Sequence, residues 1–138
     1  MSQNAIFWPM IAHAVLVYGV YFLIAVRRKA AVERGSARVA QFRENRDEPA
    51  ESLFVRNNLA NQFELPMLFH PACLALYVTG AAGPVAVWVA WGVVLTRYAH
   101  AYVHVTSNRI RYRQPLFTAG FVALAVLWAL LVFRLWTA

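Results

Sequence analysis

The chain has 138 residues, of which 61% are hydrophobic and 14% are charged, with a net charge of +7. This balance is far from that of a soluble globular domain and excludes that class. The positive charge is also concentrated, because seven of the thirteen basic residues lie in residues 27–52 and three lie in residues 106–114. We expect membrane lipids, and no nucleic acid, to be the partners of these residues.

Four apolar windows follow one another along the chain, at about residues 6–26, 59–78, 85–105 and 116–136. Each window is about 20 residues long, the length that a helix needs to cross a hydrocarbon core about 30 Å thick. The connections leave no room for a separate soluble domain. The sequence therefore predicts an all-α integral membrane protein, in which residues 1–138 form one bundle of four transmembrane helices.

The first window begins near Ile6 and tolerates Pro9 in its first turn. A secretory signal peptide is the competing interpretation of this segment. However, the basic run Arg27-Arg28-Lys29 follows the apolar residues, whereas a signal peptide has its positive charge in front of them. We expect a retained first helix that continues into the basic connector.

The basic connectors also predict the orientation of the bundle. Cytoplasmic loops of membrane proteins carry an excess of Lys and Arg. Loops 27–52 and 106–114 are therefore expected to be cytoplasmic, and both termini are expected on the opposite side of the membrane. Arg134 is the one exception to this charge pattern.

Proline, glycine and cysteine mark the remaining elements. Pro66 and Pro71 are expected to kink the second helix. Gly80–Pro84 predicts a tight turn between the second and third helices, and Pro115 is expected to open the fourth helix. Cys73 is the single cysteine, so no disulfide can form within the chain, and we expect a buried, unreactive thiol.

Glu64 is the one acidic residue outside the first loop. A carboxylate within a membrane helix is costly unless it is paired, so such a residue marks a functional site by default. On a continuous helix, Asn57, Asn61 and Glu64 share one face. Two interpretations stay open: Glu64 binds a small zwitterionic or anionic ligand, or it pairs with Arg97 or Arg56 and holds the bundle together.

The cytoplasmic half of the third window carries a second polar set. Arg97, His100 and His104 fall on one helical face, and Tyr98 and Tyr102 fall on another. Guanidiniums bind carboxylates through paired hydrogen bonds. We therefore expect a polar cavity open to the cytoplasm. The two histidines are spaced like metal ligands, but no third ligand accompanies them, and no metal is expected.

Two motifs stand in the second and third helices: Asn61-x-x-Glu64 with Pro66 and Phe69, and Arg97-Tyr98-x-His100-Ala101-Tyr102 with Asn108 and the arginines up to Pro115. With the four windows and the long basic first loop, they resemble the MAPEG family, the membrane-associated proteins of eicosanoid and glutathione metabolism. The resemblance covers essentially the whole chain and is closest to bacterial members, which implies the bacterial inner membrane. It implies a left-handed four-helix bundle assembled as a homotrimer.

The resemblance also implies an activity, a glutathione-dependent transferase or peroxidase. Its second substrate would be a lipophilic electrophile or hydroperoxide that arrives from the bilayer. Asn61 and Glu64 match the pair that holds the glutathione backbone. The other residues expected to bind glutathione are Tyr98, Tyr102, Arg97, His100 and Arg56, the last of which lies beside the position where family members often carry an arginine.

A catalytic arginine after the third helix is implied as well, because its positive charge stabilises the glutathione thiolate. The spacing from Tyr102 favours Arg109 for this role, and the distance to Pro115 favours Arg111. Glutathione is thus the expected co-substrate. The alternative is a non-catalytic protein of this fold that binds a lipid or small anion, or that serves as an assembly partner.

Overall fold

The computed structural model describes residues 1–43 and 47–138, so that residues 44–46 of the predicted first loop lie outside the described part. The helices are α1 (Phe7–Glu33), α2 (Ala50–Gln62), α3 (Phe69–Val78), α4 (Pro84–Val105) and α5 (Ile110–Trp136), with short 3-10 helices at Gln3–Ile6, Val39–Arg43 and Leu65–Leu68. The described residues contain no strand. This confirms the all-helical prediction.

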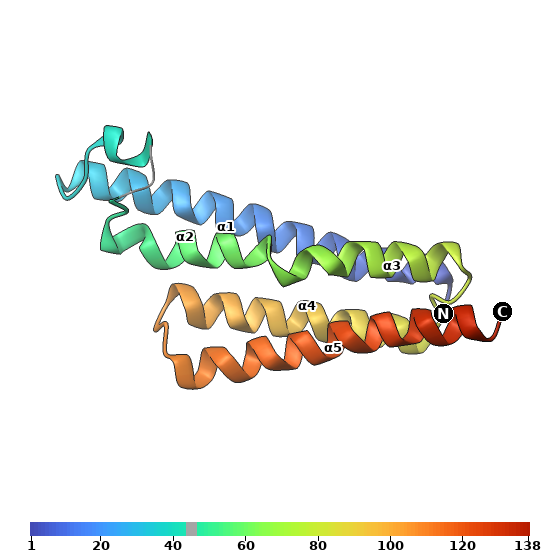
Figure 1. Cartoon of the computed structure of the whole chain (residues 1–138). Helices are drawn as coiled ribbons and strands as arrows, with labels where there is room; N and C mark the ends of the chain where they lie inside the picture. The colour runs from blue at the N-terminus through green and yellow to red at the C-terminus, as the bar shows by residue number, and fades with distance from the viewer. Residues whose placement is uncertain (44–46) are drawn as a thin grey trace.

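The described α-helices form four arms, each of which runs along the bundle (Figure 1). The first arm is α1, the second is α2 followed by α3, the third is α4 and the fourth is α5. α1 packs against α2, α4 packs along α5, and contacts between α1 and α4 join the two pairs. Both termini lie at the same end of the bundle (Figure 1). The chain therefore runs the length of the bundle four times.

The interior contains two apolar cores with a polar layer between them. One core includes Ile6, Phe69 and Val94, and the other includes Leu16 and Val55. In each of the first three arms, buried polar residues lie in the sequence between a residue of one core and a residue of the other. They are His13, Asn58, Gln62, Arg97 and His100.

Two helical segments of the described chain, Gln3–Glu33 and Ile110–Trp136, are long and apolar enough to cross a membrane. α3 is short, with ten residues, and the apolar run of α4 is interrupted by Arg97. The α2–α3 arm and α4, which carry most of the buried polar residues, thus have a weaker apolar signal than α1 and α5.

The second arm is broken at Phe63 and Glu64. Glu64 has φ −86° and ψ −116°, which is not helical. The prediction that Asn57, Asn61 and Glu64 share one face of a helix was therefore wrong, because α2 ends at Gln62. The cause is Pro66, which lacks a backbone donor and restricts the residue before it.

Arg97 stabilises this break. Asn61 lies in the last turn of α2, where backbone carbonyls lack partners within the helix. Arg97 Nη2 donates a hydrogen bond to the Asn61 carbonyl oxygen at 3.2 Å. A guanidinium from α4 thus caps the C-terminal end of α2, where the helix dipole favours a positive charge.

The turn between α4 and α5 differs from the prediction. α5 begins at Ile110, and Pro115 lies inside the helix. The turn is made by Asn108, which has φ 47°, a conformation that Asn tolerates better than most residues. The prediction that Pro115 opens the helix was wrong, because a proline this close to the N-terminus removes only one helical hydrogen bond.

The turn between α3 and α4 agrees with the prediction. Gly80 has φ 72°, which glycine adopts without steric cost, and α4 begins at Pro84. Arg134 Nε donates a hydrogen bond to the Thr79 carbonyl oxygen at 3.1 Å. The arginine that does not fit the charge pattern therefore caps the C-terminal end of α3.

Gly120 sets the close approach of α5 to α4. A Cβ atom at this position would lie 2.9 Å from Thr96 Oγ1, and that hydroxyl is held by the Gly92 carbonyl at 2.9 Å. We expect Gly120→Ala to lower the free energy of unfolding by about 1–3 kcal/mol through overpacking. SDS titration in mild detergent measures this change.

Gly92 offers the matched control for this prediction, because a Cβ atom there meets nothing within 4 Å. Gly92→Ala is expected to raise the free energy of unfolding by about 0.5–1 kcal/mol through helix propensity. Equal effects of the two substitutions would contradict the packing argument.

An ion pair links the first loop to α1. Arg28 Nε and Nη2 donate to the two carboxylate oxygens of Glu48 at 3.0 and 2.7 Å, and the Ser52 hydroxyl donates to Glu48 as well. Burial opposes ionisation of Glu48. The hydrogen bonds from Arg28 and Ser52, with the charges of Arg28 and Arg56, nevertheless hold the pKa of Glu48 below its ordinary value.

This depressed pKa predicts a pH dependence of stability. The stabilisation by ionised Glu48 is complete above the ordinary pKa of 4.5 and is lost as the pH falls through the lower pKa of the folded protein. At pH 7, Glu48→Gln is expected to lower the free energy of unfolding by about 1 kcal/mol, and the difference should shrink towards pH 3. Glu33→Gln, at an exposed carboxylate, is the control and should show a smaller difference.

Candidate functional site

A cavity of about 250 Å³ lies where the end of α2 meets α4 and α5. The second arm contributes Asn61 and Glu64, and α4 contributes His100. The side of α5 is formed by Ile110, Arg113, Gln114 and Phe117. The structure thus brings three of the predicted site residues together with Arg113, an arginine of the predicted basic turn to which the sequence had assigned no role.

Arg113 is positioned by the turn before α5. Its Nη1 donates a hydrogen bond to the Asn108 side-chain oxygen at 2.5 Å. A guanidinium has five N–H donors in a planar fork. The contact with Asn108 fixes one edge of the group, and the remaining donors are suited to an anion in the cavity.

Arg97 lies beside the cavity and is only 4% exposed. Besides its bond to Asn61, its guanidinium carbon lies 5.9 Å from the centre of the Phe117 ring, within the range of a cation–π interaction. A buried charge requires compensation, and the Asn61 carbonyl and the Phe117 ring supply part of it.

Glu64 itself is exposed and has no ion pair within 4.0 Å among the residues that the structure describes. Neither Arg97 nor Arg56 pairs with it directly. Of the two open interpretations, this geometry favours ligand binding. A single carboxylate and the guanidinium of Arg113 line the same cavity, so opposite charges are presented to one ligand.

Three buried nitrogen atoms close to this site have no hydrogen-bond partner in the described part of the chain: Arg97 Nε, His100 Nδ1 and His104 Nδ1. Buried polar atoms without a partner are rare and costly. His100 also contacts His104 and Phe117 through its ring, with centroid distances of 5.5 and 5.9 Å. This level of the bundle therefore has hydrogen-bonding groups that the described residues leave unused.

The other predicted site residues lie elsewhere in the subunit. Tyr98 and Tyr102 line a hollow against α1, where the Tyr98 hydroxyl donates to the Ala12 carbonyl oxygen at 2.8 Å. Arg56 lines a hollow between α1 and α2. The structure therefore does not bring these three residues into the cavity of Asn61 and Glu64.

The two arginines predicted to be catalytic also lie outside the cavity. Arg109 is the exposed residue that precedes α5, and Arg111 lines a shallow surface hollow on α5. A signal for the third arginine was present in the sequence. Starting from Ile110, the positions i, i+3, i+4 and i+7 form one helical face, and they are Ile110, Arg113, Gln114 and Phe117.

Metal ligands do not gather in this region. Within residues 1–43 and 47–138, no three His, Cys, Asp or Glu residues lie close enough together to hold a metal ion. Cys73 is fully buried in the larger apolar core, as expected from its position in an apolar helix.

A comparison with protein families matches residues 5–133 to the MAPEG family. Comparisons with curated proteins and with solved structures returned no match. The family match covers nearly the whole chain and agrees with the two helical segments that are able to cross a membrane. The protein is therefore an integral membrane protein, and the chain belongs to the MAPEG family.

Proposed function

We propose that the protein is a glutathione-dependent transferase or peroxidase that acts on a lipophilic electrophile or hydroperoxide. One observation carries the proposal: Asn61, Glu64 and Arg113 line the same cavity. Glutathione carries an ammonium group, carboxylates, peptide groups and a thiol. The cavity offers a partner of the right sign or polarity for several of them.

In this proposal, Glu64 accepts hydrogen bonds from the ammonium group and the Asn61 side chain bonds to the peptide backbone of glutathione. The Arg113 guanidinium faces the sulfur and takes the role that the sequence assigned to Arg109 or Arg111. A positive charge beside the sulfur lowers the pKa of the thiol, because it stabilises the thiolate.

The chemical step then uses the thiolate as the nucleophile. Its electron pair forms the new bond to an electrophilic carbon, and the leaving group departs with the bonding pair. With a hydroperoxide, the thiolate attacks the terminal oxygen, so that an S–O bond forms as the O–O bond breaks. The alkoxide leaves and takes a proton from water, which gives the alcohol and glutathione sulfenic acid. A second glutathione thiol then attacks the sulfenic sulfur, and the glutathione disulfide forms with release of water. Arg113 acts electrostatically in both cases.

The proposal includes a homotrimer in the bacterial inner membrane, with all four arms of residues 1–138 crossing as one domain. The cavity of about 250 Å³ is lined by residues of one subunit alone. Tyr98 and Tyr102 lie on another face, where a neighbouring subunit could present them to it. The basic loops 27–52 and 106–114 support a cytoplasmic position for this end of the bundle.

The test is a titration of the purified protein in detergent with glutathione. We expect thiolate absorbance to rise with saturation, followed by conjugation of a generic electrophile. S-methylglutathione, which has no thiol, should bind and compete without this absorbance. Absence of binding at millimolar glutathione would contradict the proposal. Binding without turnover of an electrophile or a hydroperoxide would favour the non-catalytic alternative.

A further inference from the structure

A groove follows α1 and the α2–α3 arm, whereas the candidate site lies where that arm meets α4 and α5. It consists of an inner hollow of about 450 Å³ and an outer hollow of about 340 Å³. Tyr21 and Phe63 line both hollows, and their rings are in contact, with centroids 6.2 Å apart. The two hollows are therefore neighbouring parts of one groove.

The outer hollow is basic. Arg28 and Arg56 both line it, together with apolar side chains such as Leu59. The charge of Arg28 is balanced by Glu48 at 2.7 Å. Arg56 has no ion pair within 4.0 Å among the described residues. Of these two cations, Arg56 is thus the one without a close ion pair in the described part of the chain, although its charge also acts on Glu48.

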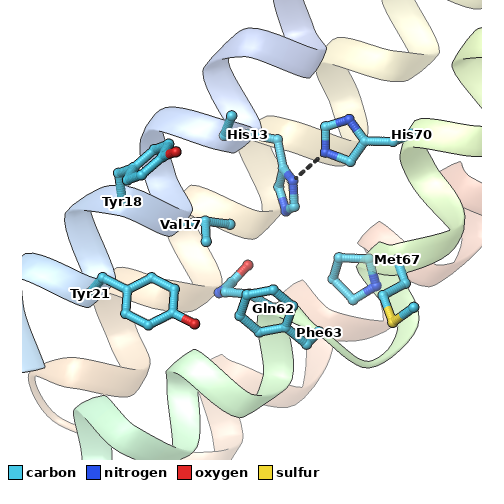
Figure 2. A pocket seen from close by; sticks show the side chains of 10 residues that line it. His13, Val17, Tyr18, Tyr21, Gln62, Phe63, Met67 and His70 are labelled. Carbon is cyan, nitrogen blue, oxygen red and sulfur yellow. Dashed lines mark hydrogen bonds between the residues drawn. The ribbon is translucent and has the colours of Figure 1, made fainter.

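The inner hollow is mainly apolar and aromatic, with a polar end (Figure 2). His13 and His70 are joined by a hydrogen bond of 3.0 Å between Nδ1 and Nε2. His13 Nε2 and Gln62 Oε1 are buried without a hydrogen-bond partner in the described part of the chain. In Figure 2 the Gln62 side-chain oxygen points towards the His13 ring.

The groove is long enough to hold a lipid of one leaflet. Arg28 and His13 are fifteen residues apart on α1, which is about 22 Å at 1.5 Å per residue. One leaflet contributes about half of a 30 Å hydrocarbon core. The groove therefore reaches from the level of the basic loop, where headgroups lie, past the depth of a leaflet's acyl chains.

We propose that this groove binds an anionic phospholipid. Arg56 binds the phosphate, one acyl chain lies along Tyr21 and Phe63 into the inner hollow, and the second chain remains in the bilayer. The positive end and the apolar wall complement the two parts of such a lipid. The open side of the groove leaves a path for the second chain. This site is independent of the proposed glutathione chemistry.

Spin-labelled lipids test the proposal in phosphatidylcholine vesicles that contain the protein. We expect the protein to immobilise labelled phosphatidylglycerol in preference to labelled phosphatidylcholine. Arg56→Gln should reduce this preference about fivefold, the effect of one cationic side chain near an anionic lipid. Arg27→Gln is the matched control, because Arg27 is exposed at the same end of α1 and does not line the groove.

A second variant tests the groove without changing its charge. Ala60 lines the outer hollow, and Ala60→Phe should reduce immobilisation of both phospholipids by filling it. Equal immobilisation of the two phospholipids by the wild type would overturn the proposal, as would equal losses in the Arg56 and Arg27 variants. Immobilisation of labelled stearic acid without labelled phosphatidylglycerol would overturn it in favour of a free fatty acid.

Discussion

Arg113→Ala is expected to lower kcat/KM for glutathione conjugation about 100-fold, the usual effect of removing a group that stabilises developing negative charge. Arg113 is the arginine that lines the cavity with Glu64, and Asn108 holds it in place. The bound thiol should also have a higher pKa in the variant. A pH titration of thiolate absorbance measures that shift, which a merely structural change would not produce.

The same substitution at Arg109 and Arg111 decides between the two assignments of the catalytic role. The geometry predicts that these two substitutions lower kcat/KM less than Arg113→Ala does, because neither residue lines the cavity. Lys29→Ala removes an exposed positive charge from a residue that is distant in sequence from Arg113. It controls for the change in net charge. A larger loss at Arg109 or Arg111 than at Arg113 would contradict the structural assignment.

Glu64→Gln is expected to raise the Kd for glutathione about 10- to 150-fold, because a charge-assisted hydrogen bond contributes about 1.5–3 kcal/mol. Stability should hardly change, since Glu64 is exposed and forms no ion pair within 4.0 Å among the described residues. Isothermal titration calorimetry and SDS titration measure the two quantities on the same preparation.

A glutathione analogue without the α-amino group makes this test specific. Wild type and Glu64→Gln should bind the analogue with equal affinity, because the partner of the carboxylate is missing. Unchanged glutathione affinity together with a large loss of stability would instead support the interpretation of Glu64 as a structural ion-pair partner.

Much of the fold could be predicted from composition and apolar windows, because a membrane helix satisfies its backbone within itself. The exact ends of the helices could not be predicted in this way. Asn61, Gln62 and Glu64 are compatible with a continuing helix, and the break depends on how Pro66 and the buried Arg97 act together. Such a contact between distant segments leaves no periodic signal in either segment.

The candidate site was predictable in part for the same reason. Asn61, Glu64 and His100 were identified because their polarity is unusual in apolar helices. Arg113 was missed because the start of α5 was placed at Pro115, so its helical face was not considered. The positions of Tyr98 and Arg56 depended on which neighbouring helix each face meets, and helical periodicity contains no information about that.

The capping of α2 by Arg97 has an evolutionary consequence. An unbroken second helix would leave this buried guanidinium without its acceptor, and a broken helix without the arginine would leave the Asn61 carbonyl unpaired. Losing the helix break alone or the arginine alone should therefore destabilise the protein more than losing both together. Across related sequences, we expect an arginine at the position of Arg97 and a proline at the position of Pro66 to be inherited as a correlated pair.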